Sequence, residues 1–347
     1  MELFDSHWYA SQVGDGIRSA DMIMHYRRAG KFRGFNPSPY FDTNWYANAA
    51  NIALSQVESP IDHFIEFGGI SLCDPHPLFN ARWYKWNYMG AEESSIPPLM
   101  HYITVGWRQG AKPHPLFWSN WYRKKYLSDD SDTDPFYHFL VEGERRNYDP
   151  NPLFSVRWYR SKYYVPSLEN SLKNYIYGGH ETRDPHFMFN STYYRSAVSC
   201  DNVSPLEHYL TRRTGVDPCT LFDAEYFSEQ YNSIPGAKLE DDLPLLVQYI
   251  ESSRYCDIDP HPLFSKRYYF GRYSDVRASG IEPFEHYMRF GFFEKRQLHP
   301  LLDPDHYLDL CPAARGRNPH IRSLTMGLVR ILLRAAHGPR IRRRGGG

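Results

Sequence analysis

The chain has 347 residues, which is enough for about two ordinary domains or for one array of repeats. It contains 28 tyrosines, 21 phenylalanines, 8 tryptophans and 26 prolines against 23 glycines, and so many large apolar rings exclude an intrinsically disordered chain. The 40 basic and 40 acidic residues balance, but no acidic residue follows Asp309, so an acidic body carries a basic tail.

An aromatic motif recurs along the chain with a period close to 38 residues. In each copy a Phe stands four and five residues before a pair of aromatic residues, as Phe41 does before Trp45-Tyr46. The residue after the Phe is Asp, Asn or Ser in every copy but one, where it is Trp118, and it would cap a helix whose fourth residue packs on the Phe. The copies start at Phe4, Phe41, Phe79, Phe117, Phe154, Phe189, Phe222 and Phe264, and a degenerate ninth starts at Leu302.

A second motif in each repeat predicts a second, shorter helix. It is a Pro followed three residues later by His, as in Pro135 and His138, and Pro suits the first position of a helix that Ser59, Asp134 or Ser204 can cap. A proline-rich connector of nearly fixed length then leads to the next Phe. Glycines five residues after the His position are predicted as helix C-caps: Gly30, Gly68, Gly106, Gly143, Gly179 and Gly291.

Each repeat therefore consists of a helix, a variable loop, a short helix and a connector. One such unit cannot bury its apolar face alone, so neighbouring units must stack. The sequence predicts an all-α, helical-repeat solenoid of about eight helix-loop-helix units plus a degenerate C-terminal unit in residues 1–309, followed by a basic tail in residues 310–347.

The repeat resembles one found beside glycosyltransferase modules in bacterial surface-polysaccharide proteins. The residues that carry the resemblance are typified by Phe264-Ser265-x-x-Tyr268-Tyr269 and Pro283-Phe284-x-His286-Tyr287, and it extends from residue 4 to about residue 308. It implies a polysaccharide context. It includes no catalytic residues, and the transferase module that often accompanies such repeats has no counterpart in this sequence.

The repeated histidines are the first candidate site, because imidazole can bind metals and transfer protons. Asn174 and Gln248 take the same position in two repeats, however, and they keep hydrogen bonding while losing titration. We therefore predict a structural role in which an imidazole N–H bonds the connector backbone. The histidines are His25, His63, His101, His138, His208 and His286.

Aromatic and acidic residues supply two further candidates. The paired aromatics of the first motif are predicted to form the core between repeats. Trp86, Trp107 and Trp118 fall outside the repeat rule and are candidate glycan contacts, or else fill gaps between repeats. The alternating carboxylates of residues 129–134 suggest calcium, but Pro135 stands where an EF-hand needs Gly, which favours a solvated loop.

The basic tail is a candidate membrane-surface segment. A helix over residues 323–337 would be amphipathic and basic, and such helices lie on anionic membranes. The alternatives are a solvated disordered tail, or attraction to an acidic polysaccharide or to nucleic acid, which is the least favoured partner. The candidate membrane contacts are Arg330, Arg334, Arg340, Arg342, Arg343 and Arg344.

The chain shows no secretory signal at its start, no apolar stretch long enough to span a membrane, and five scattered cysteines without a C-x-x-C pair. We therefore expect a cytoplasmic protein that contacts the inner membrane surface, if at all, through its tail. No nucleophile, carboxylate dyad or phosphate loop stands out, so neither catalysis nor a cofactor is expected.

With the resemblance, these features predict a non-catalytic scaffold or interaction module in bacterial surface-polysaccharide assembly that works with a glycosyltransferase. Its partner would be a protein or a polysaccharide. The alternatives are a glycan-binding module, or an accessory region of a glycosyltransferase without its catalytic domain. The acidic insertion from Asn232 to Leu243, which contains Glu240, Asp241 and Asp242, is either a contact for a basic partner or a tolerated surface loop.

Overall fold

A computed structural model describes residues 3–14, 16–93, 95–128, 132–167, 169–200, 202–212 and 215–300. Across these ranges the fold is all-α, as the sequence predicts: helices form, no strand does, and no helix is long and apolar enough to cross a membrane. The ninth repeat from Leu302 and the basic tail lie outside the described residues. The predicted helix over 323–337 and the arginines Arg330, Arg334, Arg340, Arg342, Arg343 and Arg344 therefore do as well.

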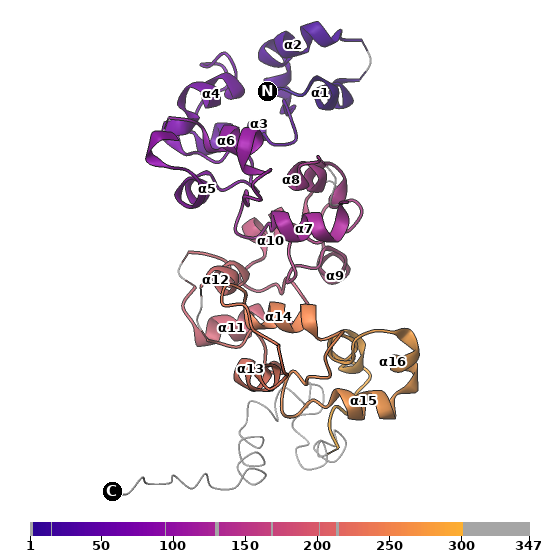
Figure 1. Ribbon diagram of the computed structural model, residues 1–347. Helices are drawn as coiled ribbons and strands as arrows, with labels where there is room; N and C mark the ends of the chain where they lie inside the picture. Colours follow the sequence, from indigo (N-terminus) through magenta and orange to yellow (C-terminus); the bar gives the residue numbers. More distant parts are fainter. Residues whose placement is uncertain are drawn as a thin grey trace, which may run out of the picture. The chain divides into compact units, whose positions relative to one another are not determined.

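Helices follow the two motifs of each repeat (Figure 1). The first helices are α1 (Ser6–Val13), α3 (Thr43–Ala49), α5 (Ala81–Tyr88), α7 (Ser119–Tyr126), α9 (Val156–Lys162), α11 (Ser191–Ala197), α13 (Ala224–Asn232) and α15 (Lys266–Arg272). The second helices are α2 (Met22–Arg28), α4 (Pro60–Ser71), α6 (Pro98–His101), α8 (Pro135–His138), α10 (Ser171–Gly178), α12 (Pro205–Thr211), α14 (Leu245–Ser252) and α17 (Pro283–His286). An additional helix, α16 (Ser274–Ser279), lies between α15 and α17.

Several second helices are extended by other helical turns. Tyr102–Gly106, Phe139–Gly143 and Tyr287–Gly291 continue α6, α8 and α17 as π-helix, and Gly30–Arg33 follows α2 as 3₁₀ helix. The two remaining short 3₁₀ turns of the described chain lie in loops, at Ser19–Asp21 and Ala91–Glu93.

The predicted starts of the first helices are confirmed. The side chains of Asp5, Asp42 and Asn80 each accept the backbone N–H three residues on at 2.9 Å, and later repeats repeat this cap. The start Phe packs on the fourth helical residue in all eight described repeats, with ring centroids 5.1 to 5.9 Å apart. Only at Trp118 does the N-cap side chain make no such bond.

The prediction that six glycines form left-handed helix C-caps is wrong, because none of the six has a positive φ. In five repeats the chain turns left-handed four residues later instead, with φ between 50° and 77°. These residues are Gly34, Leu72, Gly110, Asn147 and Lys295. The six glycines concerned are Gly30, Gly68, Gly106, Gly143, Gly179 and Gly291.

A close contact explains the glycines better than a turn does. A Cβ on Gly30, Gly106, Gly143 or Gly291 would lie only 2.0 to 2.2 Å from the hydroxyl oxygen of the buried tyrosine of the same repeat. That tyrosine is the second aromatic of the first motif, such as Tyr84, which is fully buried. The glycine is therefore required because the tyrosine packs directly on its backbone.

The connectors make hydrogen bonds to the start of their own repeat and to the start of the next one. The backbone N–H of the residue after the start Phe donates to a connector carbonyl at the end of the same repeat, as Asp42 does to Pro75 at 2.9 Å; this bond recurs in all eight described repeats at 2.8 to 3.1 Å. The Asp74 carboxylate then accepts the N–H of Ala81 at 2.8 Å, at the start of the next helix, and Asp149, Asp217 and Asp259 do likewise.

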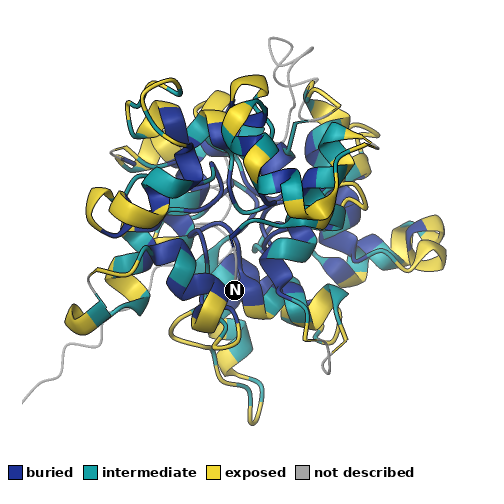
Figure 2. Cartoon of the chain, turned by 90° about the horizontal axis from the view of Figure 1, so that it is seen from above, coloured by how far each residue is buried: buried dark blue, intermediate teal, exposed yellow. Residues whose placement is uncertain are grey.

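The described chain divides into two compact bodies, residues 3–186 with Leu206–Thr211, and residues 187–205 with 212–300. In the first body, two connectors contact the second-helix region three repeats further on: the Tyr177 hydroxyl donates to the carbonyl of Pro77 at 2.9 Å, and Tyr40 donates to the carboxylate of Asp134, the N-cap of α8. In the second, the Arg289 guanidinium lies 5.7 Å from the Phe187 ring centroid. Figure 2 shows that helices bury one side and expose the other, while many connectors are buried.

We predict that Gly106→Ala lowers the free energy of unfolding by about 1–3 kcal/mol, because its Cβ would lie 2.0 Å from the Tyr84 hydroxyl oxygen. Gly178→Ala is the matched control, since a Cβ there meets nothing within 4 Å and should be neutral or stabilising by up to about 1 kcal/mol. Urea unfolding followed by circular dichroism measures both. In a Tyr84→Phe background, which lacks the hydroxyl, Gly106→Ala should lower the free energy of unfolding by less than it does in the native protein. Equal losses in the two backgrounds would show that the contact with the hydroxyl is not the cause.

Candidate functional site

Five of the six repeated histidines bond a tyrosine hydroxyl rather than the connector backbone, so that part of the prediction is wrong for them. The hydroxyls of Tyr9, Tyr46, Tyr84, Tyr122 and Tyr269 lie 2.8 to 3.1 Å from the Nδ1 atoms of His25, His63, His101, His138 and His286, respectively. Each bond joins the first helix of a repeat to its second. The imidazoles therefore form hydrogen bonds within the repeats, and this structural role explains why they recur.

The variant repeats show what this bond requires. In the fifth repeat the Tyr159 hydroxyl donates to Oδ1 of Asn174 at 3.0 Å, so the hydroxyl is the donor there. We infer that it also donates to Nδ1 of the histidines, which leaves the proton on Nε2. In keeping with this tautomer, Nε2 of His101 lies 3.4 Å from the Glu93 carboxylate.

The seventh repeat has lost the hydroxyl and with it the whole arrangement. Phe227 takes the tyrosine position, and Gln248, at the His position, exchanges two hydrogen bonds of 2.8 Å with the backbone of Glu240. Ser253 stands where other repeats have the close-packed glycine. Without the hydroxyl, neither the histidine nor the glycine is needed.

A second set of buried imidazoles lies in the connectors. Nδ1 of His76, His114 and His261 accepts the backbone N–H two residues on at 3.1 Å, and Oδ1 of Asn151 does the same in the fourth connector. Burial lowers the pKa of His76 and His261 to about 4 and that of His114 to about 3. These rings are neutral at physiological pH and hold the connector turn.

The three candidate tryptophans have different environments. Trp107 and Trp118 are only 5% and 7% exposed, and their indole N–H groups donate to the carbonyls of Ile103 and Pro115 at 3.1 and 3.2 Å. Neither ring presents a face on which a sugar could stack, so both are corrected from glycan contacts to packing residues. Trp86, on α5, is 83% exposed and keeps an open face.

No group of three or more His, Cys, Asp or Glu side chains in the described part of the chain could hold a metal ion. In the suspected calcium loop, residues 129–131 lie outside the description. Asp132 pairs with Arg108 at 3.7 Å, and Asp134 caps α8. The Asp134 carboxylate also accepts the hydroxyls of Tyr40 and Tyr102. The described carboxylates of this loop thus serve the fold.

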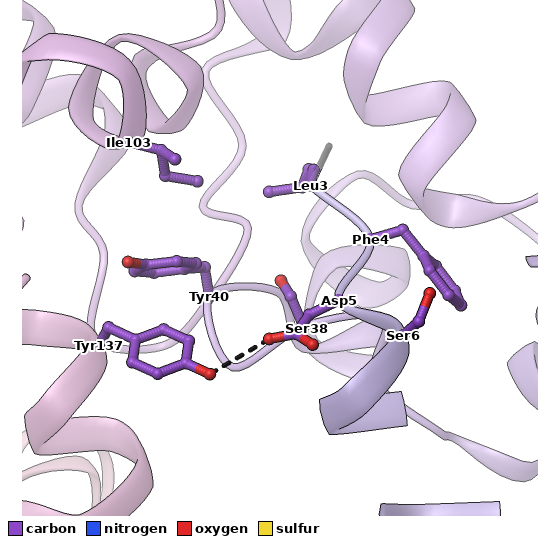
Figure 3. Close-up of a pocket in the computed structure, with 8 residues that line it drawn as sticks. All are labelled: Leu3, Phe4, Asp5, Ser6, Ser38, Tyr40, Ile103 and Tyr137. Carbon is purple, nitrogen blue, oxygen red and sulfur yellow. Dashed lines mark hydrogen bonds between the residues drawn. The ribbon is translucent and has the colours of Figure 1, made fainter. Parts of the chain in front are cut away.

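A pocket of about 620 Å³ lies in the first body, among the first repeat, the connector after it, and the third and fourth repeats (Figure 3). Leu3 and Ile103 face it with apolar side chains, and the rings of Tyr40 and Tyr137 lie 5.5 Å apart along one side. Its volume is within the range of about 300–1,000 Å³ that small-ligand sites occupy.

Polar groups also line this pocket, and two of them bear on what it could bind. The Asp5 carboxylate accepts the Tyr137 hydroxyl at 3.1 Å and caps α1. The Ser38 hydroxyl is buried and has no hydrogen-bond partner among the described residues. The sequence does not bring these residues together, because they come from three different repeats. Their one sequence signal is that Ser38, Tyr40 and Tyr137 depart from the residues found at the same positions elsewhere in the array.

Comparison with known proteins adds no family to this geometry. No family model, curated protein or solved structure matches the chain. Function must therefore be argued from the residues themselves.

We predict that His138→Ala lowers the free energy of unfolding by about 1–3 kcal/mol, because the buried Tyr122 hydroxyl loses its partner. His138→Asn should cost less than about 1 kcal/mol, since Asn174 bonds Tyr159 in this way. Chemical denaturation of the two variants at pH 7.5 tests this. Equal losses in both would show that the ring, and not its hydrogen bond, stabilises the repeat.

Acid should destabilise the protein through His114. Its pKa of about 3 lies below the ordinary value of about 6.5, so the unfolded chain binds the proton first and stability falls as the pH drops from about 6.5 toward 3. His114→Asn keeps the turn, as Asn151 does, and removes this proton. Between pH 7 and 4 the variant should lose less stability than the native chain, by up to about 3 kcal/mol.

Denaturant unfolding at several pH values measures the difference. Burial raises the pKa of Asp74 and Asp217 to about 6, which acts in the opposite direction, but both carboxylates are present in both proteins and cancel in the comparison. Parallel stability curves for the native chain and His114→Asn would refute the role of this imidazole.

Proposed function

We propose that this protein is a helical-repeat solenoid that acts as a non-catalytic scaffold in bacterial surface-polysaccharide assembly, where it orients a glycosyltransferase. The observation that carries the proposal is that the repeated polar residues are used within and between the repeats. Tyr46 bonds His63, Asp42 binds the connector backbone, and Tyr177 reaches Pro77, 100 residues earlier. Such contacts fix the spacing of repeats, which is what a scaffold needs.

The contacts between distant repeats support the solenoid. In the first body Tyr137 bonds Asp5 at 3.1 Å, and Lys173 lies 3.9 Å from Asp42, so the first repeat meets the fourth and the second meets the fifth. Repetition of one offset is expected when units stack with a constant rotation. The polysaccharide context and the glycosyltransferase come from the resemblance of the repeat.

The acidic insertion is the surface that we propose for the partner. Glu240, Asp241 and Asp242 are exposed, and the backbone of Glu240 is held by Gln248 at 2.8 Å, so the loop presents its charges from a fixed position. An acidic loop of this kind favours a basic surface on the partner and speeds its association.

Photo-crosslinking tests the scaffold. A photo-crosslinker at Asp241 should capture a glycosyltransferase of the same assembly system, while one at the exposed Arg157 of α9 should not.

Charge reversal provides the specificity control. The double substitution Glu240→Lys with Asp241→Lys should weaken the captured complex by about tenfold at low salt and less at high salt. Capture of the same enzyme from both crosslinker positions, or an affinity that charge reversal leaves unchanged, would contradict the proposed contact surface.

A further inference from the structure

We propose that the pocket beside Ser38, Tyr40 and Tyr137 binds a neutral sugar residue of a polysaccharide. This goes beyond the scaffold and does not depend on it, because the pocket lies in the first body and the proposed partner surface is the loop of residues 232–243. The inference rests on three features: departures from the repeat pattern, an unpaired buried hydroxyl, and aromatic rings held in place.

The departures from the repeat pattern coincide in space. At the position of Tyr40 the other described connectors have Leu or Met, such as Leu78 and Leu116. At the position of Ser38 five of them have His, one has Asn and one has Cys. In four of these connectors the His or Asn side chain accepts a backbone N–H. Tyr137 is the only aromatic residue at its position in the eight second helices. These three exceptions come from the first connector and from the fourth repeat, and they line one pocket.

The Ser38 hydroxyl is the polar group that indicates a ligand. Ser38 is only 3% exposed, its Oγ has no partner among the described residues, and Figure 3 shows it pointing into the space between Tyr40 and Leu3. A buried hydroxyl without a hydrogen bond loses its bonds to water and gains none in return. A ligand hydroxyl that bonds Oγ would make up for this loss.

The aromatic side of the pocket is preorganised. The Tyr40 hydroxyl donates to Asp134, and the Tyr137 hydroxyl donates to Asp5 at 3.1 Å, so neither ring has to be ordered when a ligand binds. Rigid aromatic rings contribute contact area at a low entropic cost. With Leu3 and Ile103 they offer an apolar surface for the C–H face of a pyranose.

The charge of the lining disfavours an anionic ligand. Asp5 is the single charged residue, and no basic side chain is found among the described residues that line the pocket. A phosphate or a uronic acid would meet an uncompensated carboxylate, whereas sugar hydroxyls can donate to it. A metal cation would need more oxygen ligands than one carboxylate that already accepts two hydrogen bonds.

Saturation-transfer difference NMR and calorimetry with the full chain test the proposal. The probes are neutral tetrasaccharides of glucose, galactose, mannose and N-acetylglucosamine, with tetragalacturonate as the anionic comparison. We expect at least one neutral probe to bind with a Kd of about 1 mM or tighter, and tetragalacturonate to bind at least about tenfold more weakly. No neutral binding at about 10 mM, or equal binding of tetragalacturonate, would overturn the proposal.

Two substitutions locate the site. Tyr40→Leu restores the residue of the other connectors, and Ser38→Ala removes a hydroxyl that makes no bond, so the second should fold as the native chain does. Each should weaken the neutral probe by about tenfold. Trp86→Ala is the control, because this exposed ring is the rival stacking surface. Binding that survives both pocket variants, or that Trp86→Ala abolishes, would overturn the assignment.

Discussion

The hydrogen bond between a buried tyrosine hydroxyl and an imidazole or amide is the interaction on which the repeat depends. It joins the two helices of the unit, and the same hydroxyl lies so close to the following turn that only glycine fits there, as Tyr84 and Gly106 show. Tyrosine, histidine and glycine are therefore one physical unit, although they are 17 and 5 residues apart in sequence. A buried hydroxyl without its partner would cost about 1–3 kcal/mol, and the repeat that lacks the hydroxyl, at Phe227, also lacks the histidine, at Gln248.

The connectors carry the order from one repeat to the next. Their carbonyls, most of them on proline, accept a backbone N–H at the start of the first helix of the same repeat. Carboxylates such as Asp74 accept a backbone N–H at the start of the first helix of the next repeat. These acceptors are fixed by proline and by the neutral imidazole of residues such as His76, so the connector length varies little. Most length changes fall in the loop between the two helices of a repeat.

A repeat array separates shared structure from local function. Residues that recur in most units, including the histidines, are accounted for by packing and hydrogen bonding inside the units. Residues that occur once are free of that requirement, and Ser38, Tyr40 and Tyr137 are such exceptions. Titratable groups that sequence alone marks as candidate chemistry, such as Asp134 with its two tyrosine donors, belong to the shared structure instead.

The sequence by itself determined the all-α class, the start of each first helix and the staple between residues such as Phe41 and Tyr46, because these features depend on neighbours within about five positions. It did not determine the partner of the histidines, the reason for the glycines or the burial of Trp107 and Trp118. Those depend on which atoms meet across a helix pair. The pocket depends on tertiary structure entirely, because Asp5 and Tyr137 are 132 residues apart in sequence. They meet only because the connectors set how the repeats of the first body pack.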